Sequence, residues 1–175
     1  REERLPDAAT GRDGADILDS LLRADRTAAP AGTPDPRFIG RLTAPQVVTL
    51  EFDEPLDRPG GSPVLVADGW VEYPYSQTVF AAWQAGATYD PATLEARGRD
   101  GEWRTVYEHF GYPAGMPRRM ALPLAGLPAG TDALRLSSNL ELYWDRIAVV
   151  YEDHQGRQYS ESSLALMDPD GSDFR

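Results

Sequence analysis

The chain has 175 residues, and its 17 basic and 28 acidic residues give a formal net charge of -11 at pH 7. So acidic a chain has no basic surface for nucleic-acid phosphates or for an anionic membrane. It contains no cysteine, which excludes disulfides, thiolate nucleophiles and zinc–thiolate sites. Its apolar runs are too short to span a bilayer. We therefore expect no nucleic-acid partner and no insertion into a membrane.

Turn-forming residues occur along the whole chain, with 15 prolines and 16 glycines. The apolar runs between them are short and rich in Val, Leu, Tyr and Trp, which is typical of strands. The length suits one domain. We therefore predict an all-β fold, an antiparallel β-sandwich of jelly-roll type, over residues 13–167. Residues 1–12 are charged and without periodicity, so they are predicted to be a linker or the tail of a preceding module.

One helix is predicted, over residues 14–25, ahead of the strands. Ile17, Leu18, Leu21 and Leu22 fall on one helical face, and Asp13 or Asp16 can act as the N-cap. The segment 28–36 is rich in proline and continues as an extended connector.

The strands are predicted in chain order from residue 47. The segment 47–52 alternates, and the nearly continuous apolar segment 63–70 suits a central strand covered on both faces. A second such stretch, TVFAAWQ at 78–84, is expected to lie beside it. The segments 93–97 and 102–108 flank a Gly-bounded turn and form a hairpin, followed by short strands in RRMALPL (118–124) and SSLALM (162–167).

The longest β-rich stretch is Leu134 to Tyr151, around which we expect the sheets to form. Its buried parity changes near Asp145 and Arg146, because Trp144 shares one parity with the preceding leucines and Ile147 begins the other. Such a switch indicates a bulge or a break between two strands.

Several segments together resemble a known bacterial region. In chain order they are GRDGADILDSLLRAD, VLVADGWVEYP, GEWRTV, FGYPAGMPRRM and LRLSSNLELYWDRIAVV, which span residues 11–151. This order resembles the C-terminal region of exported proteins with FG-GAP or VCBS-repeat propellers, associated with ASPIC and UnbV segments and sometimes with TPR repeats. The resemblance implies an exported, multi-domain parent, periplasmic or extracellular, and supplies no catalytic residue. The WDRIAVV run is also similar to the closing strand of galactose-binding-like jelly rolls.

Aromatic residues in predicted loops are the main candidates for a ligand site. Tyr73, Tyr75, Phe110 and Tyr112 could stack on sugar rings, and His109 could line the same pocket. The alternative is that the tyrosines cap loops. The four tryptophans, Trp70, Trp83, Trp103 and Trp144, are predicted to lie in the core.

The carboxylates give weaker signals. Glu141 and Asp145 on one regular strand would lie about 13 Å apart, too far for the roughly 5 to 10 Å of a glycosidase pair, and we expect Asp145 to pair with an arginine. Asp168, Asp170 and Asp173 resemble part of a calcium loop, but Gly171 occupies the wrong position for an EF-hand. We predict no cofactor, leave calcium open, and expect residues 168–175 to form an acidic tail.

Three functions remain open. The first is a non-catalytic accessory module that packs against a neighbouring domain of the parent protein or a protein partner. The second is a carbohydrate-binding module that uses the loop aromatics. The third is a glycan hydrolase, for which no catalytic residues can be assembled from the sequence. An exposed aromatic platform would distinguish the second function from the first.

Overall fold

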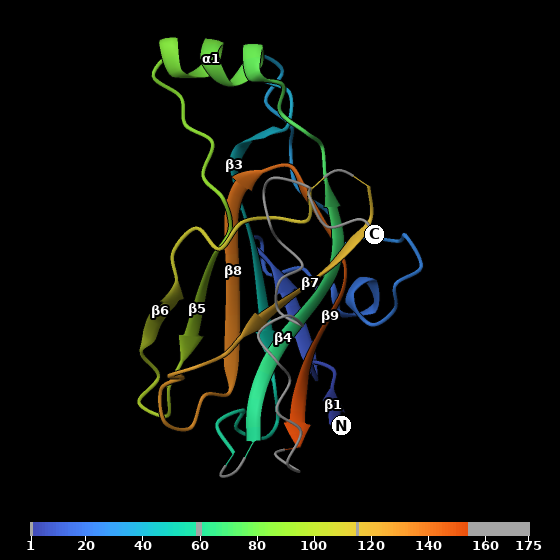
Figure 1. Ribbon diagram of the computed structural model, residues 1–175, viewed down its shortest axis with the longest axis vertical. Coiled ribbons are helices and arrows are strands. Elements are labelled where there is room, and N and C mark those ends of the chain that lie inside the picture. Colours follow the sequence, from blue (N-terminus) through green and yellow to red (C-terminus); the bar gives the residue numbers. More distant parts are fainter. Residues whose placement is uncertain (1, 59–60, 115, 154–175) are drawn as a thin grey trace, which may run out of the picture.

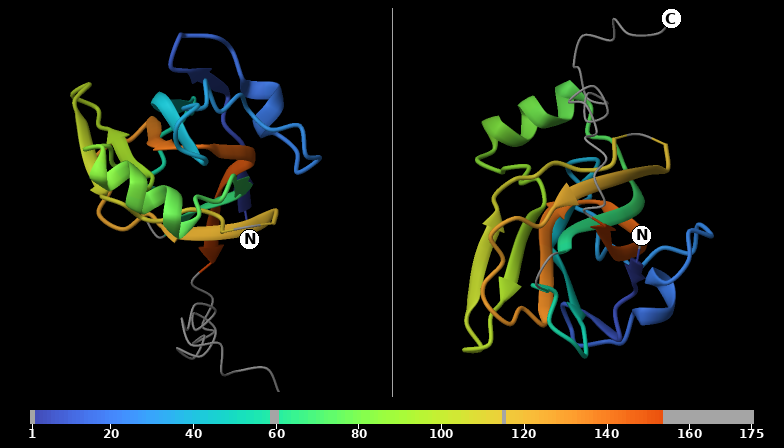
Figure 2. Two further views of the ribbon diagram at one scale, coloured as in Figure 1. Left: turned by 90° about the horizontal axis from the view of Figure 1, so that it is seen from above. Right: turned by 60° about the horizontal axis from the view of Figure 1, so that its bottom comes forward.

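The computed structural model describes residues 2–58, 61–114 and 116–153, and these form two antiparallel sheets that pack face to face (Figure 1, Figure 2). The four-stranded sheet has the order β1 (Glu2–Arg4), β9 (Leu142–Asp153), β4 (Gly61–Val71) and β7 (Arg118–Pro123). The five-stranded sheet has the order β2 (Ala8–Gly11), β3 (Arg41–Glu51), β8 (Ala133–Leu140), β5 (Thr93–Arg97) and β6 (Trp103–Tyr107).

The chain changes sheet at every connection after β3 except the β5–β6 hairpin. This repeated crossing is the topology expected of a jelly roll, and it brings strands distant in sequence side by side. The predicted all-β antiparallel sandwich is confirmed. The hairpin over residues 93–107 and the central position of residues 63–70, in β4 between β7 and β9, are confirmed as well.

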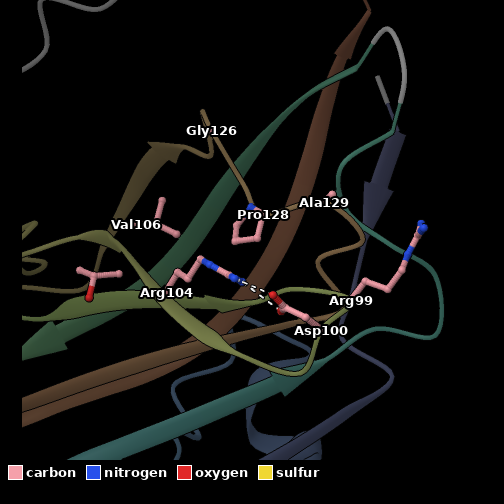
Figure 3. A pocket seen from close by; sticks show the side chains of 8 residues that line it. Arg99, Asp100, Arg104, Val106, Gly126, Pro128 and Ala129 are labelled. Atoms are coloured by element: carbon pink, nitrogen blue, oxygen red, sulfur yellow. Dashed lines mark hydrogen bonds and ion pairs between the residues drawn. The ribbon is translucent and has the colours of Figure 1, made fainter.

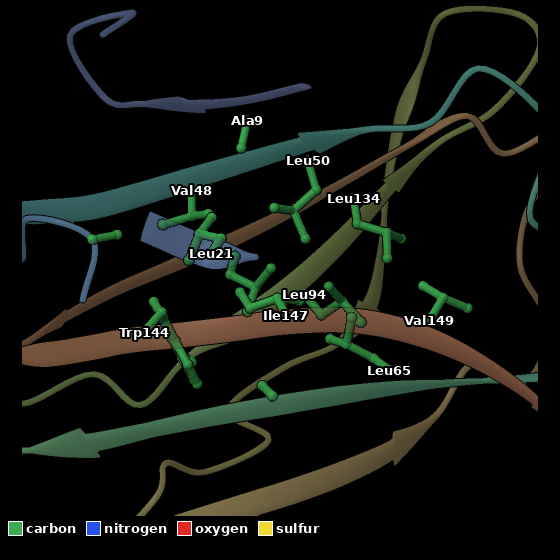
Figure 4. Packing of buried hydrophobic residues seen from close by; sticks show 14 of the residues in the cluster. Ala9, Leu21, Val48, Leu50, Leu65, Leu94, Leu134, Trp144, Ile147 and Val149 are labelled. Carbon is green, nitrogen blue, oxygen red and sulfur yellow. The ribbon is translucent and has the colours of Figure 1, made fainter. Parts of the chain in front are cut away.

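The core lies between the two sheets and is filled mainly by aliphatic side chains, together with Phe52, Trp144 and Tyr151 (Figure 4). Val48 and Leu50 of β3 and Leu134 of β8 come from one sheet, and Trp144 and Ile147 of β9 come from the other. Because successive side chains of a strand point to opposite faces of its sheet, every second residue of these strands points into the core.

The change of parity predicted near Asp145 and Arg146 is a bulge, and the segment 134–151 also contains a break that its parity does not indicate. It breaks into β8 and β9 at Glu141, so that Leu140 and Leu142 belong to different sheets. Within β9 the register with β4 then shifts, because Asp68 faces Arg146 while Gly69 faces Trp144. Asp145 is the extra residue of this bulge, and it moves the inward face from Trp144 to Ile147.

The N-terminal residues differ from the prediction. Residues 1–12 contain β1 and β2, edge strands of the two sheets, instead of a linker. The helix expected over 14–25 is a four-residue 3-10 turn, η1 (Leu18–Leu21). Leu21 is buried in the core, whereas Leu22 forms a backbone bridge to Arg146. One helical turn is enough to bury Leu21, so these contacts do not require a longer helix.

The segment 78–84 is the second correction. It forms α1 (Ser76–Gln84), at the end of the molecule opposite β1, and it neither pairs with β4 nor joins a sheet (Figure 1). The strand expected at 162–167, the predicted tail 168–175 and its candidate calcium ligands Asp168, Asp170 and Asp173 lie outside the described residues. Of the described helices, none is long and apolar enough to cross a bilayer.

Candidate binding surface

The helix α1 ends in a well-formed cap. Gly86 has φ +72°, its N–H donates to the Trp83 carbonyl over 3.0 Å, and the N–H of Ala87 donates to the Ala82 carbonyl over 2.8 Å. These two bonds form a Schellman motif, which requires a residue that tolerates positive φ. The two alanines before Trp83 favour helix, and Gly86 therefore ends it after nine residues.

The apolar face of α1 points away from the protein core. Val79, Phe80 and Trp83 follow Ser76 at helical spacing, so all four lie on one face. Trp83 is 71% exposed and Phe80 is 56% exposed, and their ring centroids lie 5.8 Å apart. Only Ala82 is fully buried on the opposite side. An exposed helix normally covers this outer face with charged residues, but α1 contains none.

The segment before α1 adds two tyrosines to the same face. Tyr73 and Tyr75 are exposed, and with Tyr112 from the β6–β7 connection they line a hollow beside the helix. We use the term aromatic surface for the eight residues that line this hollow: Tyr73, Pro74, Tyr75, Ser76, Val79, Phe80, Trp83 and Tyr112. None of the eight is charged.

A tight turn at Gly40 contacts the start of the segment that carries Tyr73 and Tyr75. Gly40 has φ +76°, and a Cβ at this position would lie 2.4 Å from the Glu72 carbonyl oxygen and 3.0 Å from the Pro74 nitrogen. The Glu72 N–H also donates to the Glu141 carbonyl over 3.0 Å. This close approach of two backbone segments requires glycine at position 40. The contact helps to position the segment that carries Tyr73 and Tyr75.

A buried carboxylate braces the same turn. Asp35 accepts hydrogen bonds from Arg37 at 3.0 Å and Arg41 at 2.8 Å, and its side chain is 2% exposed. The bonds from Arg37, with a smaller contribution from Arg41, lower the pKa of Asp35 to about 2. Arg41 also donates from Nε to the Thr88 carbonyl over 2.8 Å, so one arginine links the turn to the segment that follows α1.

The segment that follows α1 has its own polar anchor. Asn139 donates from its amide to the Thr88 carbonyl over 3.0 Å and to the Asp90 carboxylate over 2.7 Å. Its side-chain oxygen accepts the Asp90 N–H over 2.7 Å, and the Ser138 hydroxyl donates to the Asp90 carbonyl. Asn139 and Ser138 are buried whereas Thr88 and Asp90 are exposed, so the network joins an exposed segment to a buried strand. Both connections of α1 are thus fixed to the sandwich, while its outer face stays uncovered.

The structure brings together three of the five predicted site residues. Tyr73, Tyr75 and Tyr112 belong to the aromatic surface. Phe110 is not among the residues that line the hollow; like Tyr112 it is half-buried and packs against the core. His109 is exposed, has φ +49° and does not line the hollow.

The sequence prediction missed Phe80 and Trp83, the most prominent members of the surface. Trp83 was expected in the core, and the structure corrects this: the spacing of Ser76, Val79, Phe80 and Trp83, followed by Gly86, was the helical signal that could have identified them.

The other three tryptophans are less exposed. Trp144 is buried as predicted, whereas Trp70 and Trp103 are only half-buried. The ring of Trp70 stacks on Tyr143 with centroids 5.4 Å apart, and the Arg135 guanidinium lies 4.2 Å from the Trp103 centroid. Trp70 and Trp103 are therefore partnered within the domain.

A second hollow lies at the β5–β6 hairpin, lined partly by Arg99, Asp100, Arg104 and Pro128 (Figure 3). Its volume of about 730 Å³ is close to the 710 Å³ of the hollow beside α1. Size therefore does not separate the two. Asp100 accepts two hydrogen bonds from Arg104, which lower its pKa to about 2, so this pair is satisfied internally. The hollow beside α1 has no such internal pairing among its lining side chains.

Glu141 and Asp145, the two carboxylates considered for catalysis, have different surroundings. Glu141 lies between β8 and β9 and accepts a hydrogen bond of 2.5 Å from the Tyr143 hydroxyl. Burial and this carboxylate raise the pKa of Tyr143 to about 12. Asp145 is buried at the bulge, and its Oδ1 has no hydrogen-bond partner. The arginine partner expected for Asp145 is not found among the described residues.

No group of three or more acidic, histidine or cysteine side chains in the described part of the chain is arranged to hold a metal ion. Most of the large apolar side chains that are exposed in the described part of the chain lie beside α1, and the chemistry of this surface is stacking and burial of apolar area with a few hydroxyl groups.

Comparison with known proteins gives no family assignment. No family model matches the sequence, and no curated protein matches it. A solved structure that is similar to this chain is the F5/8 type C domain of a protein from Bacteroides fragilis, at 14% sequence identity and a TM-score of 0.38. The similarity covers 83% of this chain and 90% of that domain.

Proposed function

We propose that this domain is a non-catalytic carbohydrate-binding module of a larger exported bacterial protein, and that the aromatic surface is its ligand site. The observation that carries the proposal is the outward position of Phe80 and Trp83 on α1, beside Tyr73 and Tyr75. Leaving such rings in water forgoes about 25 cal/mol for each Å² that burial would remove from solvent. A ligand that covers them recovers that free energy.

Sugar rings suit this surface chemically. The face of a pyranose carries C–H groups that pack on an aromatic ring, while its hydroxyls hydrogen-bond at the edges. The hydroxyls of Tyr73, Tyr75 and Ser76 are polar groups of the kind that fix orientation in such a site. The surface thus combines apolar contact area with a small number of polar groups.

The position of the surface in the domain supports a role in display. Glu2 of β1 pairs with Tyr151 of β9, so the first and last described strands meet at one end of the sandwich. The helix α1 lies at the other end (Figure 1). The ligand site therefore lies at the end of the sandwich remote from the paired residues Glu2 and Tyr151. We propose that the parent is an exported protein of the FG-GAP or VCBS-repeat type.

Native affinity electrophoresis tests the proposal on the full chain. We expect at least one glycan in a panel of soluble neutral and acidic polysaccharides to retard the wild type. Trp83→Ala should weaken that binding by about 10- to 100-fold, because it removes one stacked ring. Leu5→Ala is the matched control, since Leu5 is an exposed apolar residue outside the aromatic surface.

Two results would refute the proposal. One is an unretarded wild type across the whole panel, with no rise in melting temperature on adding any glycan. The other is equal retardation of the wild type and the Trp83→Ala variant, which would place the ligand elsewhere.

A further inference from the structure

We infer that the ligand is a neutral, extended glycan chain of pyranoses with equatorial hydroxyls, bound along α1 with its sugar faces against the rings. This inference rests on the proposed function and adds the chemical class of the saccharide.

Charge argues for a neutral ligand. None of the eight residues of the aromatic surface is charged, and the charged residue next to it in sequence is the exposed acidic Glu72. The whole chain carries a net charge of -11. An anionic polysaccharide would therefore meet repulsion and would find no arginine in the surface to pair with its carboxylates or sulfates. A neutral chain meets neither obstacle.

The arrangement of the rings argues for a chain rather than a single sugar. Phe80 and Trp83 lie one helical turn apart, with centroids separated by 5.8 Å and planes tilted by 32°. That spacing is comparable with the width of one pyranose ring, so neighbouring rings can contact neighbouring sugars. Tyr73, Tyr75 and Tyr112 extend the contact beyond the helix. A single sugar could cover only part of this surface.

The polar groups argue for equatorial hydroxyls. A pyranose with equatorial hydroxyls presents C–H groups on both faces and oxygens around its edge, whereas an axial hydroxyl places an oxygen over one face. An oxygen pressed against Phe80 or Trp83 would lose its hydrogen bonds to water without a replacement. Among the eight residues that line the hollow, hydroxyl groups come from the three tyrosines and Ser76, and none comes from Val79, Phe80 or Trp83. Sugars stacked on Phe80 and Trp83 must therefore keep their oxygens at the edge.

Isothermal titration of the full chain with defined oligosaccharides tests this inference. The neutral equatorial series consists of cello-, xylo- and chito-oligosaccharides from two to six units; manno-oligosaccharides provide axial hydroxyls, and oligogalacturonates provide negative charge. We expect affinity to rise about tenfold or more from dimer to hexamer in at least one equatorial series. The axial and acidic hexamers should bind at least about tenfold more weakly than that hexamer.

Ionic strength tests the role of charge in binding, and two substitutions of Phe80 test the role of its ring. Raising ionic strength should leave neutral binding unchanged and strengthen acidic binding, because it screens repulsion. Phe80→Ala should flatten the dependence on chain length, whereas Phe80→Tyr should retain it. Leu5→Ala again serves as the control outside the surface.

The outcomes distinguish this inference from the proposed function. If an acidic or axial oligosaccharide binds most tightly, or if affinity does not depend on length, and Trp83→Ala still abolishes binding, the inference is wrong while the carbohydrate module stands. If no saccharide binds the wild type, both are wrong.

Discussion

Two tryptophans of this domain lie in opposite environments although both sit in apolar runs. Trp144 of β9 is 1% exposed and packs between the sheets, and Trp83 of α1 is 71% exposed at the end of the molecule. Trp144 belongs to the buried cluster of the core, whereas α1 buries only Ala82. Hydrophobicity alone therefore does not predict burial: the element that carries the residue decides which way it points.

The contrast also separates stability from binding. Residues around Trp144 stabilise the sandwich by excluding water from both faces of the core. Residues around Trp83 contribute little to that core, so their apolar area is available to a ligand. Substitutions can test this separation, because a change at Trp144 should lower stability and a change at Trp83 should lower ligand affinity.

Truncation of Trp144 should be the most damaging change. Trp144→Ala leaves a cavity in a fully buried layer, and such changes cost about 3–5 kcal/mol. Urea unfolding followed by far-UV circular dichroism measures the loss in the free energy of unfolding. A loss below about 1 kcal/mol would contradict the position of this side chain in the core.

The turn that supports the aromatic surface should be the next most sensitive. Gly40→Ala places a Cβ 2.4 Å from the Glu72 carbonyl oxygen at φ +76°, so the turn must shift or stay strained. We expect a loss of about 1–3 kcal/mol in the free energy of unfolding. Because the shift moves Tyr73 and Pro74, glycan affinity should fall as well.

The matched control for this turn is Gly86→Asn, since Asn tolerates positive φ and no heavy atom lies within 4 Å of a Cβ there. This variant should stay close to wild type in both measurements. If the Gly40→Ala variant had the same free energy of unfolding and the same glycan affinity as the Gly86→Asn variant, the turn at Gly40 would not position the aromatic surface.

Much of the fold follows from local patterns in the sequence. The hairpin of β5 and β6, the central strand β4 and the bulge at Asp145 are all visible, because alternation and turn residues act over a few positions. The N-terminal strands are not visible. Glu2–Arg4 and Ala8–Gly11 have no apolar alternation, and they become strands only because β9 and β3 offer free edges.

The candidate site was predictable in part. Tyr73 and Tyr75 stand beside Pro74, a turn residue, and exposure of such a loop is the usual outcome. Trp83 was missed because TVFAAWQ satisfies a buried-strand pattern and a helix pattern equally well over so few residues. The deciding contact, the close approach of Gly40 to Glu72, joins residues far apart in sequence, so no local pattern contains it.

Low pH should weaken the hydrogen bonds of Asp35 to Arg37 and Arg41 beside the Gly40 turn. The pKa of Asp35 is lowered from 3.8 to about 2 by hydrogen bonds from Arg37 and Arg41. A carboxylate with a lowered folded pKa stabilises the folded state above its unfolded pKa, and this contribution is lost as pH falls from about 4 to about 2. The Asp35→Asn variant lacks that ionisation. Its melting temperature should therefore fall less steeply than that of wild type across this range.

Thermal unfolding in steps of pH measures the difference. The comparison with Asp100→Asn is informative, because the pKa of Asp100 is also lowered to about 2 but its ion pair with Arg104 lies at the hairpin end of the domain. Loss of glycan affinity at low pH should follow Asp35 and be indifferent to Asp100. Equal effects of the two variants on affinity would contradict a specific role for the Asp35 turn.

The smallest expected effect on stability belongs to Trp83, and it is the most telling one. Trp83→Ala removes a ring that is 71% exposed, so the free energy of unfolding should change by no more than about 0.5 kcal/mol. Alanine also has a high helix propensity, which offsets part of the lost contact with Phe80. The same variant should lose most of its glycan affinity. If Trp83→Ala instead destabilised the domain as Trp144→Ala does, Trp83 would serve the fold, and the outer face of α1 would lose its claim to be a ligand site.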